Sequence, residues 1–335
     1  MNNNNNIDLL KKGFVDVQID NNLDLFAEIE KMRRDKNAII LAHYYQEGDV
    51  QDIADFVGDS LALSQKAADT DADIILFAGV HFMAETAKIL APEKKVLIPD
   101  LNAGCSLAES CPADEFAEFK KKFPNHTVIS YINTTAEIKA LTDITCTSTN
   151  AMEIVNSMDK NEEIIFAPDR NLGNYINSVT GRNMVIWDGA CHVHEEFSLE
   201  RILELKKEHP DAKIIAHPEC QKPILIVAEH IGSTSSLLKF TDQDKAQKYI
   251  VATESGIIHQ MKKNNPQKMY IPAPPKDSTC ACSDCRYMKL ITIKKLYNCL
   301  KYELPEVIVD EEISRKAVIS IKRMLEISAR IGKKT

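Results

Sequence analysis

The chain of 335 residues contains nine cysteines, and their number and spacing indicate a metal centre rather than a disulfide framework. An odd number of thiols, in a sequence whose first residues lack the layout of a signal peptide, is typical of reduced cysteines that can bind metals. Three of them, Cys105, Cys191 and Cys285, recur at nearly equal intervals. Four thiolates would close a metal site, whereas three leave one position open for a substrate.

Two kinds of metal centre are compatible with three thiolates. A [4Fe–4S] cluster bound by three cysteines has one iron that can act as a Lewis acid on a substrate oxygen. Zinc is the alternative, because thiolate ligands alone do not distinguish the two metals. The segment with Cys280, Cys282 and Cys285 contains a single Cys-x-x-Cys pair, so it does not predict a four-cysteine zinc knuckle. A nicotinamide or ATP enzyme is disfavoured because the sequence has no Gly-rich nucleotide fingerprint and no Walker loop.

A second group of polar residues lies where predicted strands end. His43, Tyr131, Asn133, His217 and Glu219 each end or follow an apolar, β-branched run. In parallel α/β units, functional residues gather at the carboxyl ends of strands. We therefore expect these five side chains to supply acid–base groups and hydrogen-bond donors, although a single such histidine is more often structural.

Hydroxyl groups recur where helices are predicted to begin. Ser60, Ser148, Ser233 and Thr234 lie in three similar small-residue segments. Helix N-termini and hydroxyls bind anions such as carboxylate or phosphate, which predicts a multiply anionic substrate. Simple N-capping of the helices is the alternative interpretation.

The elements that position these residues recur three times along the chain. First strands are expected at 39–43, 128–133 and 214–217, second strands at 73–77, 163–166 and 249–252, and third strands at 96–99, 184–187 and 269–272. Short apolar runs that alternate with helical patterns predict parallel sheets covered on both faces. The predicted fold class is α/β, with three pseudo-symmetric three-layer α/β/α domains around a central cluster cavity.

The repeats imply domain boundaries. Residues 1–22, which include an asparagine tract, are expected to form a disordered or weakly ordered N-terminal segment, and the repeats are expected at 23–106, 107–192 and 193–288. Residues 289–335 are expected to form a C-terminal helical segment that packs back on the first repeat.

Charge and hydropathy exclude several classes of partner. The net charge of −8 argues against nucleic acid, and no apolar run is long enough for a membrane span. We expect a cytoplasmic protein that acts on small molecules.

The ordered motifs resemble the quinolinate synthase family, the iron–sulfur enzymes of NAD biosynthesis. The resemblance covers residues 37–293. It rests on segments 42–46, 57–61, 82–90, 104–108, 131–134, 168–173, 189–194, 217–220 and 231–234. It implies condensation of iminoaspartate with dihydroxyacetone phosphate to quinolinate, phosphate and water. It also implies one [4Fe–4S] cluster per chain, with Cys105, Cys191 and Cys285 as ligands and one open iron.

The resemblance carries the family's site residues onto this chain. Its substrate-binding residues correspond to His43, Ser60, Tyr131, Asn133, Ser148, His217, Glu219 and Thr234, with Tyr45 near the cluster, and we add the neighbours Ile132 and Pro218. We expect Glu219 to be the catalytic base. His43 and His217 would orient or protonate oxygens, and Tyr45 and Tyr131 would donate hydrogen bonds. An L-aspartate oxidase or dehydrogenase is the expected source of iminoaspartate.

The sequence departs from the family at two places. The last cysteine segment reads Cys-x-Cys-x2-Cys, which leaves the roles of Cys280 and Cys282 open, and Tyr44 stands where asparagine is common. Two alternatives to the synthase remain. One is an iron–sulfur hydroxy-acid dehydratase, and the other is a non-catalytic zinc or iron–sulfur sensor.

Overall fold

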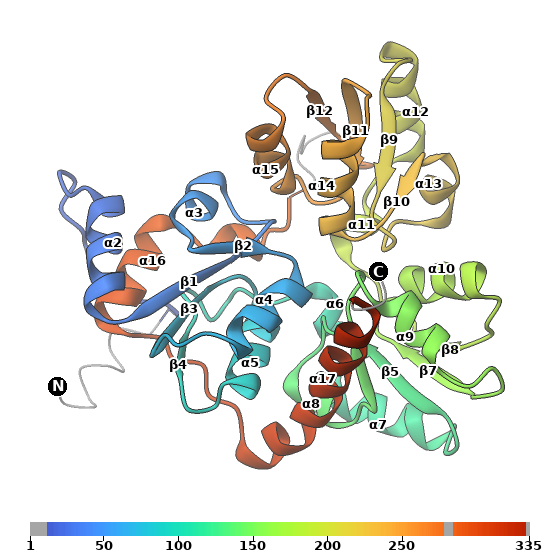
Figure 1. Cartoon of the computed structure of the whole chain (residues 1–335), viewed down its shortest axis with the longest axis horizontal. Coiled ribbons are helices and arrows are strands. Elements are labelled where there is room, and N and C mark those ends of the chain that lie inside the picture. Colours follow the sequence, from blue (N-terminus) through green and yellow to red (C-terminus); the bar gives the residue numbers. More distant parts are fainter. Residues whose placement is uncertain (1–11, 278–283, 333–335) are drawn as a thin grey trace. The chain divides into compact units, whose positions relative to one another are not determined.

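The computed structural model describes residues 12–277 and 284–332, and its backbone is dominated by three parallel sheets of four strands each. Figure 1 shows each sheet covered by helices on its two faces. The predicted α/β class is therefore confirmed. Cys280 and Cys282, whose roles the sequence left open, lie outside the described residues.

The first sheet has the strand order β2-β1-β3-β4. Its strands are β1 (Ala38–His43), β2 (Phe56–Gly58), β3 (Ile74–Ala78) and β4 (Lys95–Leu97). Helices α4 (Ser60–Ala68) and α5 (His81–Leu90) pack together on one face. Helices α2 (Leu25–Asp35) and α16 (Ile293–Tyr302) pair on the other face, and α3 (Gly48–Ile53) connects β1 to β2.

The second sheet repeats this order as β6-β5-β7-β8. Its strands are β5 (Thr127–Tyr131), β6 (Ile144–Cys146), β7 (Ile164–Ala167) and β8 (Val185–Ile186). Helices α9 (Ala151–Ser157) and α10 (Arg170–Thr180) pair on one face, and α7 (Ala113–Lys121) and α8 (Ala136–Ala140) on the other. The short helix α6 (Ser106–Glu109) precedes α7.

The third sheet has the order β10-β9-β11-β12. Its strands are β9 (Lys213–Ala216), β10 (His230–Ile231), β11 (Lys248–Ala252) and β12 (Met269–Pro272). Helices α14 (Thr234–Gln243) and α15 (Ile257–Asn264) pair on one face, and α12 (Leu199–Glu208) and α13 (Lys222–Val227) flank the sheet opposite them. The short helix α11 (His192–Glu195) links the second sheet to the third.

The central strands form where the sequence has runs of β-branched and aromatic residues. All residues of β3 and β7 are buried, as expected for strands covered on both faces. The nine predicted strands are present, each within one or two residues of its expected bounds. Each sheet also has a fourth strand that the sequence did not predict, namely β2, β6 and β10, which have only two or three residues.

The strand order places functional residues at a defined crevice. In an order that begins 2-1-3, the crossovers on either side of the first strand lie on opposite faces. The loops after β1 and β3, after β5 and β7, and after β9 and β11 therefore open a crevice at the carboxyl edge of each sheet. His43 ends β1, Tyr131 ends β5 and His217 follows β9.

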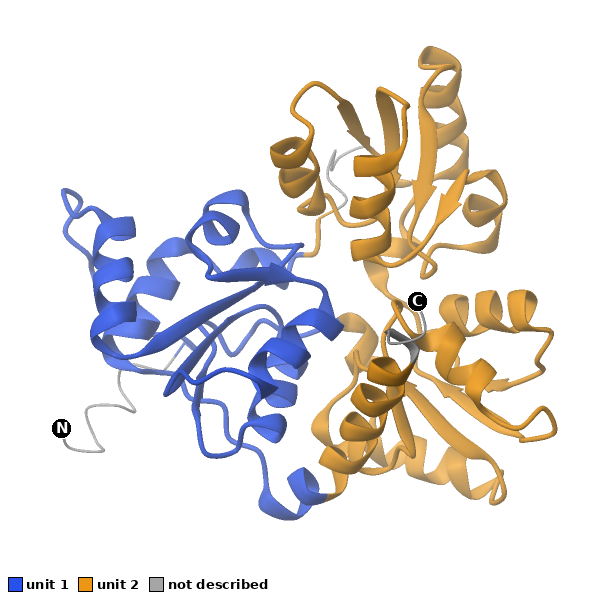
Figure 2. Cartoon of the chain, in the orientation of Figure 1, with its two compact units in different colours: residues 1–105, 286–315 blue, residues 106–285, 316–335 orange. Residues whose placement is uncertain are grey.

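The described chain forms two compact units, drawn in different colours in Figure 2. One consists of residues 1–105 and 286–315, with the first sheet, and the other of residues 106–285 and 316–335, with the second and third sheets. The C-terminal segment 289–335 is thus divided between the units. Helix α16 packs on α2 in the first unit, whereas Ser320 of α17 (Glu311–Gly332) donates to the carbonyl of Lys139 in the second. The predicted domain boundaries stay predictions.

None of the described helices is both long enough and apolar enough to cross a membrane.

Gly189 precedes Cys191 and has no room for a side chain. A Cβ atom there would lie 2.6 Å from the carbonyl oxygen of Pro168, and it would also collide with Ser110 Oγ. The Gly189 amide donates to that same carbonyl, so the backbone at this point is held in place.

We predict that Gly189→Ala lowers the free energy of unfolding by about 1–3 kcal/mol, because a backbone oxygen cannot move aside for the methyl group. Urea unfolding followed by circular dichroism measures the change. Gly181→Asn is the control, because Gly181 has open space around it and a φ of +71°, which asparagine tolerates. Equal midpoints for Gly189→Ala and the parent chain would contradict the prediction.

Candidate active site

The densest group of predicted site residues lies in the second unit and centres on Glu219. Strand β9 ends at Ala216, because Pro218 has no amide to continue the ladder. The loop that follows closes tightly, since the Cys220 amide donates to the carbonyl of His217. This loop places Glu219 in the interior, where it is only 3% exposed.

Three side chains contact the carboxylate of Glu219. The Tyr131 hydroxyl donates to Oε1 at 2.6 Å, and His194 Nδ1 lies 3.1 Å from Oε2. His217 Nδ1 lies 3.6 Å from Oε1. Tyr131 belongs to the second sheet and His217 to the third, so this carboxylate connects the two.

The two histidines are oriented by hydroxyl groups. His217 Nε2 lies 3.1 Å from Ser148 Oγ, and His194 Nε2 lies 3.1 Å from Thr253 Oγ1. Their rings stack with centroids 4.9 Å apart. Each ring therefore turns its Nδ1 toward Glu219.

The buried carboxylate is held in its ionised form. Burial alone would raise the pKa of Glu219, but the neighbouring His194 and His217 and the hydrogen bond from Tyr131 lower it to about 2. Asp169, which follows β7, shows the opposite behaviour. Burial and the charge of Glu219 raise the pKa of Asp169 well above its ordinary value, although backbone amides of Leu172 and Cys191 donate to it.

Of the four hydroxyl residues, Ser233 is the one that caps its helix. Asp59 caps α4, Ser233 caps α14, and Asn150 occupies the N-cap position of α9. The capping interpretation thus applies to Ser233, but not to Ser60, Ser148 or Thr234. Ser60 and Thr234 are the first helical residues, and Ser148 contacts His217.

Asn133 and Ile132 follow β5 directly. The Ile132 amide donates to the carbonyl of Cys146, which fixes the loop against β6. The Oδ1 atom of Asn133 is buried and has no hydrogen-bond partner among the described residues. Such a buried acceptor is costly unless a ligand or water satisfies it.

The cysteines divide by exposure. Cys105, Cys191 and Cys285 are partly exposed, whereas Cys111, Cys146, Cys220 and Cys299 are fully buried. Burial raises the pKa of the Cys111 thiol to about 12 and that of Cys146 further still, which keeps these thiols protonated and inert. Cys191 and Cys285 pack against the same apolar core of the third sheet.

Cys191 also belongs to a mixed set of potential ligands. Its sulfur, a nitrogen of His194 and a carboxylate oxygen of Glu219 lie within 4.8 Å of one another. The Cys191 amide donates to Asp169 Oδ2, and the Cys285 amide donates to Glu254 Oε1 at 3.1 Å.

The first unit contains the remaining predicted residues. His43 ends β1 and is 4% exposed, and its Nδ1 accepts a hydrogen bond from the Tyr45 amide. The rings of His43 and Tyr45 meet edge to face at 4.5 Å. Lys289 Nζ donates to the Tyr45 carbonyl, which fixes this turn. Cys105 lies further along the chain, after β4.

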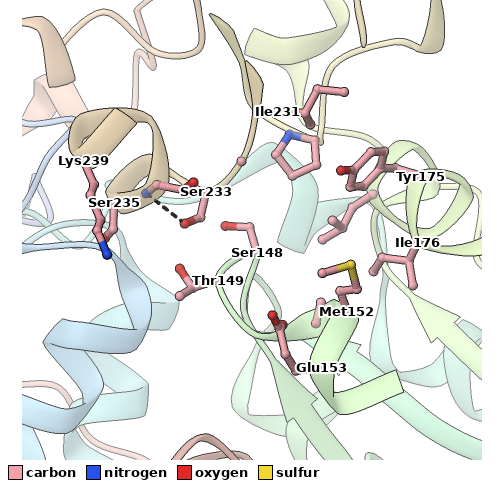
Figure 3. A pocket seen from close by; sticks show the side chains of 15 residues that line it. Ser148, Thr149, Met152, Glu153, Tyr175, Ile176, Ile231, Ser233, Ser235 and Lys239 are labelled. Carbon is pink, nitrogen blue, oxygen red and sulfur yellow. Dashed lines mark hydrogen bonds between the residues drawn. The ribbon is translucent and has the colours of Figure 1, made fainter. Parts of the chain in front are cut away.

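A cavity of about 410 Å³ opens beside Ser148 in the second unit. Ser148 and Pro218 line it, whereas His217 and Glu219 do not. Figure 3 shows Ser233, Ser235 and Lys239 on one side and the apolar groups of Met152, Tyr175, Ile176 and Ile231 on the other. Lys239 is exposed and has no ion-pair partner in the described part of the chain.

Comparison with known proteins shows the family of this chain. A family model described as Quinolinate synthetase A protein matches residues 27–326. The chain belongs to this family. It is an enzyme family of NAD biosynthesis.

Curated relatives match over nearly their whole length. A quinolinate synthase from Microcystis aeruginosa is 58% identical over 305 residues, 91% of this chain and 95% of the relative. One from Thermosynechococcus vestitus is 57% identical over 306 residues, 91% of this chain and 96% of the relative. One from Nostoc sp. is 58% identical over 306 residues, 91% of this chain and 94% of the relative.

Three residues near Glu219 were not predicted as site residues. His194 and Asp169 lie within motifs that resemble the quinolinate synthase family, and Thr253 directly follows β11. The sequence-based assignment of acid–base residues covered the loops after the first predicted strand of each repeat. Extending it to the loops after the second predicted strand of each repeat would have found Asp169 and Thr253.

Because the pKa of Glu219 is about 2 in the folded chain and 4.5 is the ordinary value, its ionisation stabilises the fold above pH 4.5. This contribution is lost as the pH falls from 4.5 toward 2. We predict that the stability difference between the metal-free parent chain and Glu219→Gln narrows over that range, in urea unfolding at successive pH values. Glu200→Gln, at an exposed position, is the control. A difference that is the same at pH 6 and pH 3 would contradict the prediction.

Proposed function

We propose that this chain is a quinolinate synthase that condenses iminoaspartate with dihydroxyacetone phosphate. The products are quinolinate, phosphate and two waters, and the atoms balance without an oxidant or reductant. The observation that carries the proposal is the buried, ionised Glu219 within 4.8 Å of Cys191, an arrangement that would bring an acid–base group beside a thiolate ligand. Membership of the quinolinate synthase family supports it.

We further propose that Cys105, Cys191 and Cys285 hold a [4Fe–4S] cluster. Their partial exposure supports this, because a ligand thiol must be reached by iron, and the other four described cysteines are buried and protonated. Thiolates are the ligands that iron–sulfur clusters prefer. When bound, a cluster with three protein ligands supplies one open iron that can polarise a substrate oxygen.

The side chains around Glu219 would perform the proton transfers. Glu219 is ionised at neutral pH, as a base must be, and it would accept a proton from a substrate carbon whose acidity a neighbouring imine or carbonyl raises. Tyr131 donates to one oxygen of Glu219 and leaves the other near His194. His217, held by Ser148, would orient or protonate a departing hydroxyl.

The hydroxyl residues Ser148 and Thr234, with Asn133 and Lys239, would bind the anionic substrates. Both substrates are anionic, and Ser148 and Thr234 lie at or near helix N-termini that favour negative charge. Asn133 offers a buried, unsatisfied amide oxygen to a ligand donor. The cavity that Ser148 shares with Lys239 would offer hydroxyls and a positive charge to an anion.

The residues of the first unit complete the proposed assignment. We propose that His43 and Ser60 bind substrate and that Tyr45, whose ring lies against His43, donates a hydrogen bond during dehydration. Ile132 and Pro218 would shape the site through their backbone. Iminoaspartate hydrolyses readily in water, so an L-aspartate oxidase or dehydrogenase in the same compartment, the cytoplasm, would supply it.

Replacing Cys105, Cys191 or Cys285 singly by alanine should strip the cluster, because the other cysteines of the described residues are buried and cannot replace the lost thiolate. Iron and sulfide content after anaerobic reconstitution, with the visible absorption, measures the loss. Cys146→Ala and Cys299→Ala are matched controls, since both thiols are fully buried, and they should retain full iron content. Full occupancy in Cys191→Ala would refute the assignment.

Anaerobic incubation with iminoaspartate and dihydroxyacetone phosphate should yield quinolinate and phosphate in equal amounts. Glu219→Gln should keep the cluster absorption and lose about 10²–10⁴-fold in kcat, the range typical of one acid–base group. A change in KM alone would assign Glu219 to binding. Dehydration of a hydroxy acid without phosphate release would instead favour the iron–sulfur dehydratase.

A further inference from the structure

We infer that the cluster-free chain holds a single zinc-like divalent cation on Cys191, His194 and Glu219. The ligand atoms of these three residues lie within 4.8 Å of one another, and all three belong to the second unit. Thiolate, imidazole and carboxylate are each zinc ligands, and three protein ligands leave a fourth position for water. This set shares one cysteine with the proposed cluster and does not need the other two.

The contact between His194 and Glu219 has the spacing of two metal ligands. Nδ1 and Oε2 lie 3.1 Å apart, yet Nδ1 is buried and makes no hydrogen bond within the described residues. Two ligands at about 2.0–2.1 Å from a tetrahedral zinc lie roughly 3.3 Å apart. A cation between them therefore needs only a small displacement, and it would replace the ion contact of Nδ1 with Oε2 by a bond from each atom to the metal.

The surrounding residues orient the three ligands. His194 Nε2 is held by the buried hydroxyl of Thr253, as the second nitrogen of a metal-binding histidine usually is. Tyr131 donates to Glu219 Oε1, which leaves Oε2 directed at His194. The Cys191 amide is anchored on Asp169. Each ligand thus has a partner that fixes its direction before any metal binds.

Charge also favours a divalent cation at this point. Glu219 is a buried carboxylate, and metal binding would release the thiol proton of Cys191 and add a second negative charge. A doubly charged cation neutralises both, whereas an uncompensated buried charge is costly. The bound cation would occupy both the cluster ligand Cys191 and the base Glu219. If the proposed function holds, such a chain would be inactive and unable to accept a cluster until the metal is removed.

Titration of the full, cluster-free chain with Co²⁺ under anaerobic conditions tests the inference. We expect one Co²⁺ per chain, with the absorption of a tetrahedral site and a thiolate-to-cobalt charge-transfer band, and displacement by Zn²⁺. Cys191→Ser should lose the band, and His194→Ala should bind at least ~100-fold more weakly. Thr253→Val, a milder change with less risk to folding, should weaken binding about 10–100-fold.

The decisive control is Cys285→Ser. It should still bind one Co²⁺ with the same spectrum, although it should fail to assemble a cluster. Loss of Co²⁺ binding in Cys285→Ser, full binding in a folded His194→Ala, or no binding by the parent chain would each overturn the inference. Anaerobic cluster reconstitution of the zinc-free parent is measured separately, so a failure of the proposed cluster is distinguishable. Zinc added first should block reconstitution.

Discussion

One buried carboxylate, that of Glu219, links several separate elements of the second unit. Glu219 is 3% exposed and ionised, so its charge must be compensated by hydrogen bonds and nearby cationic or polar groups. Those groups come from separate elements: Tyr131 ends β5, His194 lies on α11, and His217 follows β9. The loops that carry them must therefore keep their relative positions, and the parallel sheets beneath those loops provide that rigidity. The raised pKa of Asp169 is a further consequence, because two adjacent buried carboxyls cannot both be ionised readily.

Much of the fold could be predicted because a continuous apolar run is stable in a strand whose two faces are both buried. Strands β3 and β7 are apolar throughout and are buried on both faces. The edge strands β2 and β10 could not be predicted in the same way, since two or three residues carry too little pattern. Their existence depends on pairing with a central strand that is already in place, which is a tertiary effect.

The site shows the same division between local and distant causes. Tyr131, His217 and Glu219 could be predicted because strand ends are local features with a known functional bias. His194 could not be predicted in this way. It lies on α11, and its position at the site depends on stacking against His217, which follows β9, with ring centroids 4.9 Å apart. Helix starts were predicted near Ser60 and Thr234, but Asp59 and Ser233 take the caps, and this frees the following hydroxyls from that role. Nor does residue type separate Cys191 from Cys220. Only burial in the folded chain makes one thiol accessible and the other inert.

The proximity of Glu219 to Cys191 has two consequences that oppose each other. A base beside an open metal position can act on a substrate that the metal has polarised, which is an advantage for a dehydration. The same short distances bring a thiolate, an imidazole and a carboxylate close enough to bind a competing cation. Removing His194 to avoid that cation would also take away a contact that lowers the pKa of Glu219. His194 thus helps to keep Glu219 ionised, together with His217 and Tyr131, and at the same time offers a nitrogen ligand to zinc.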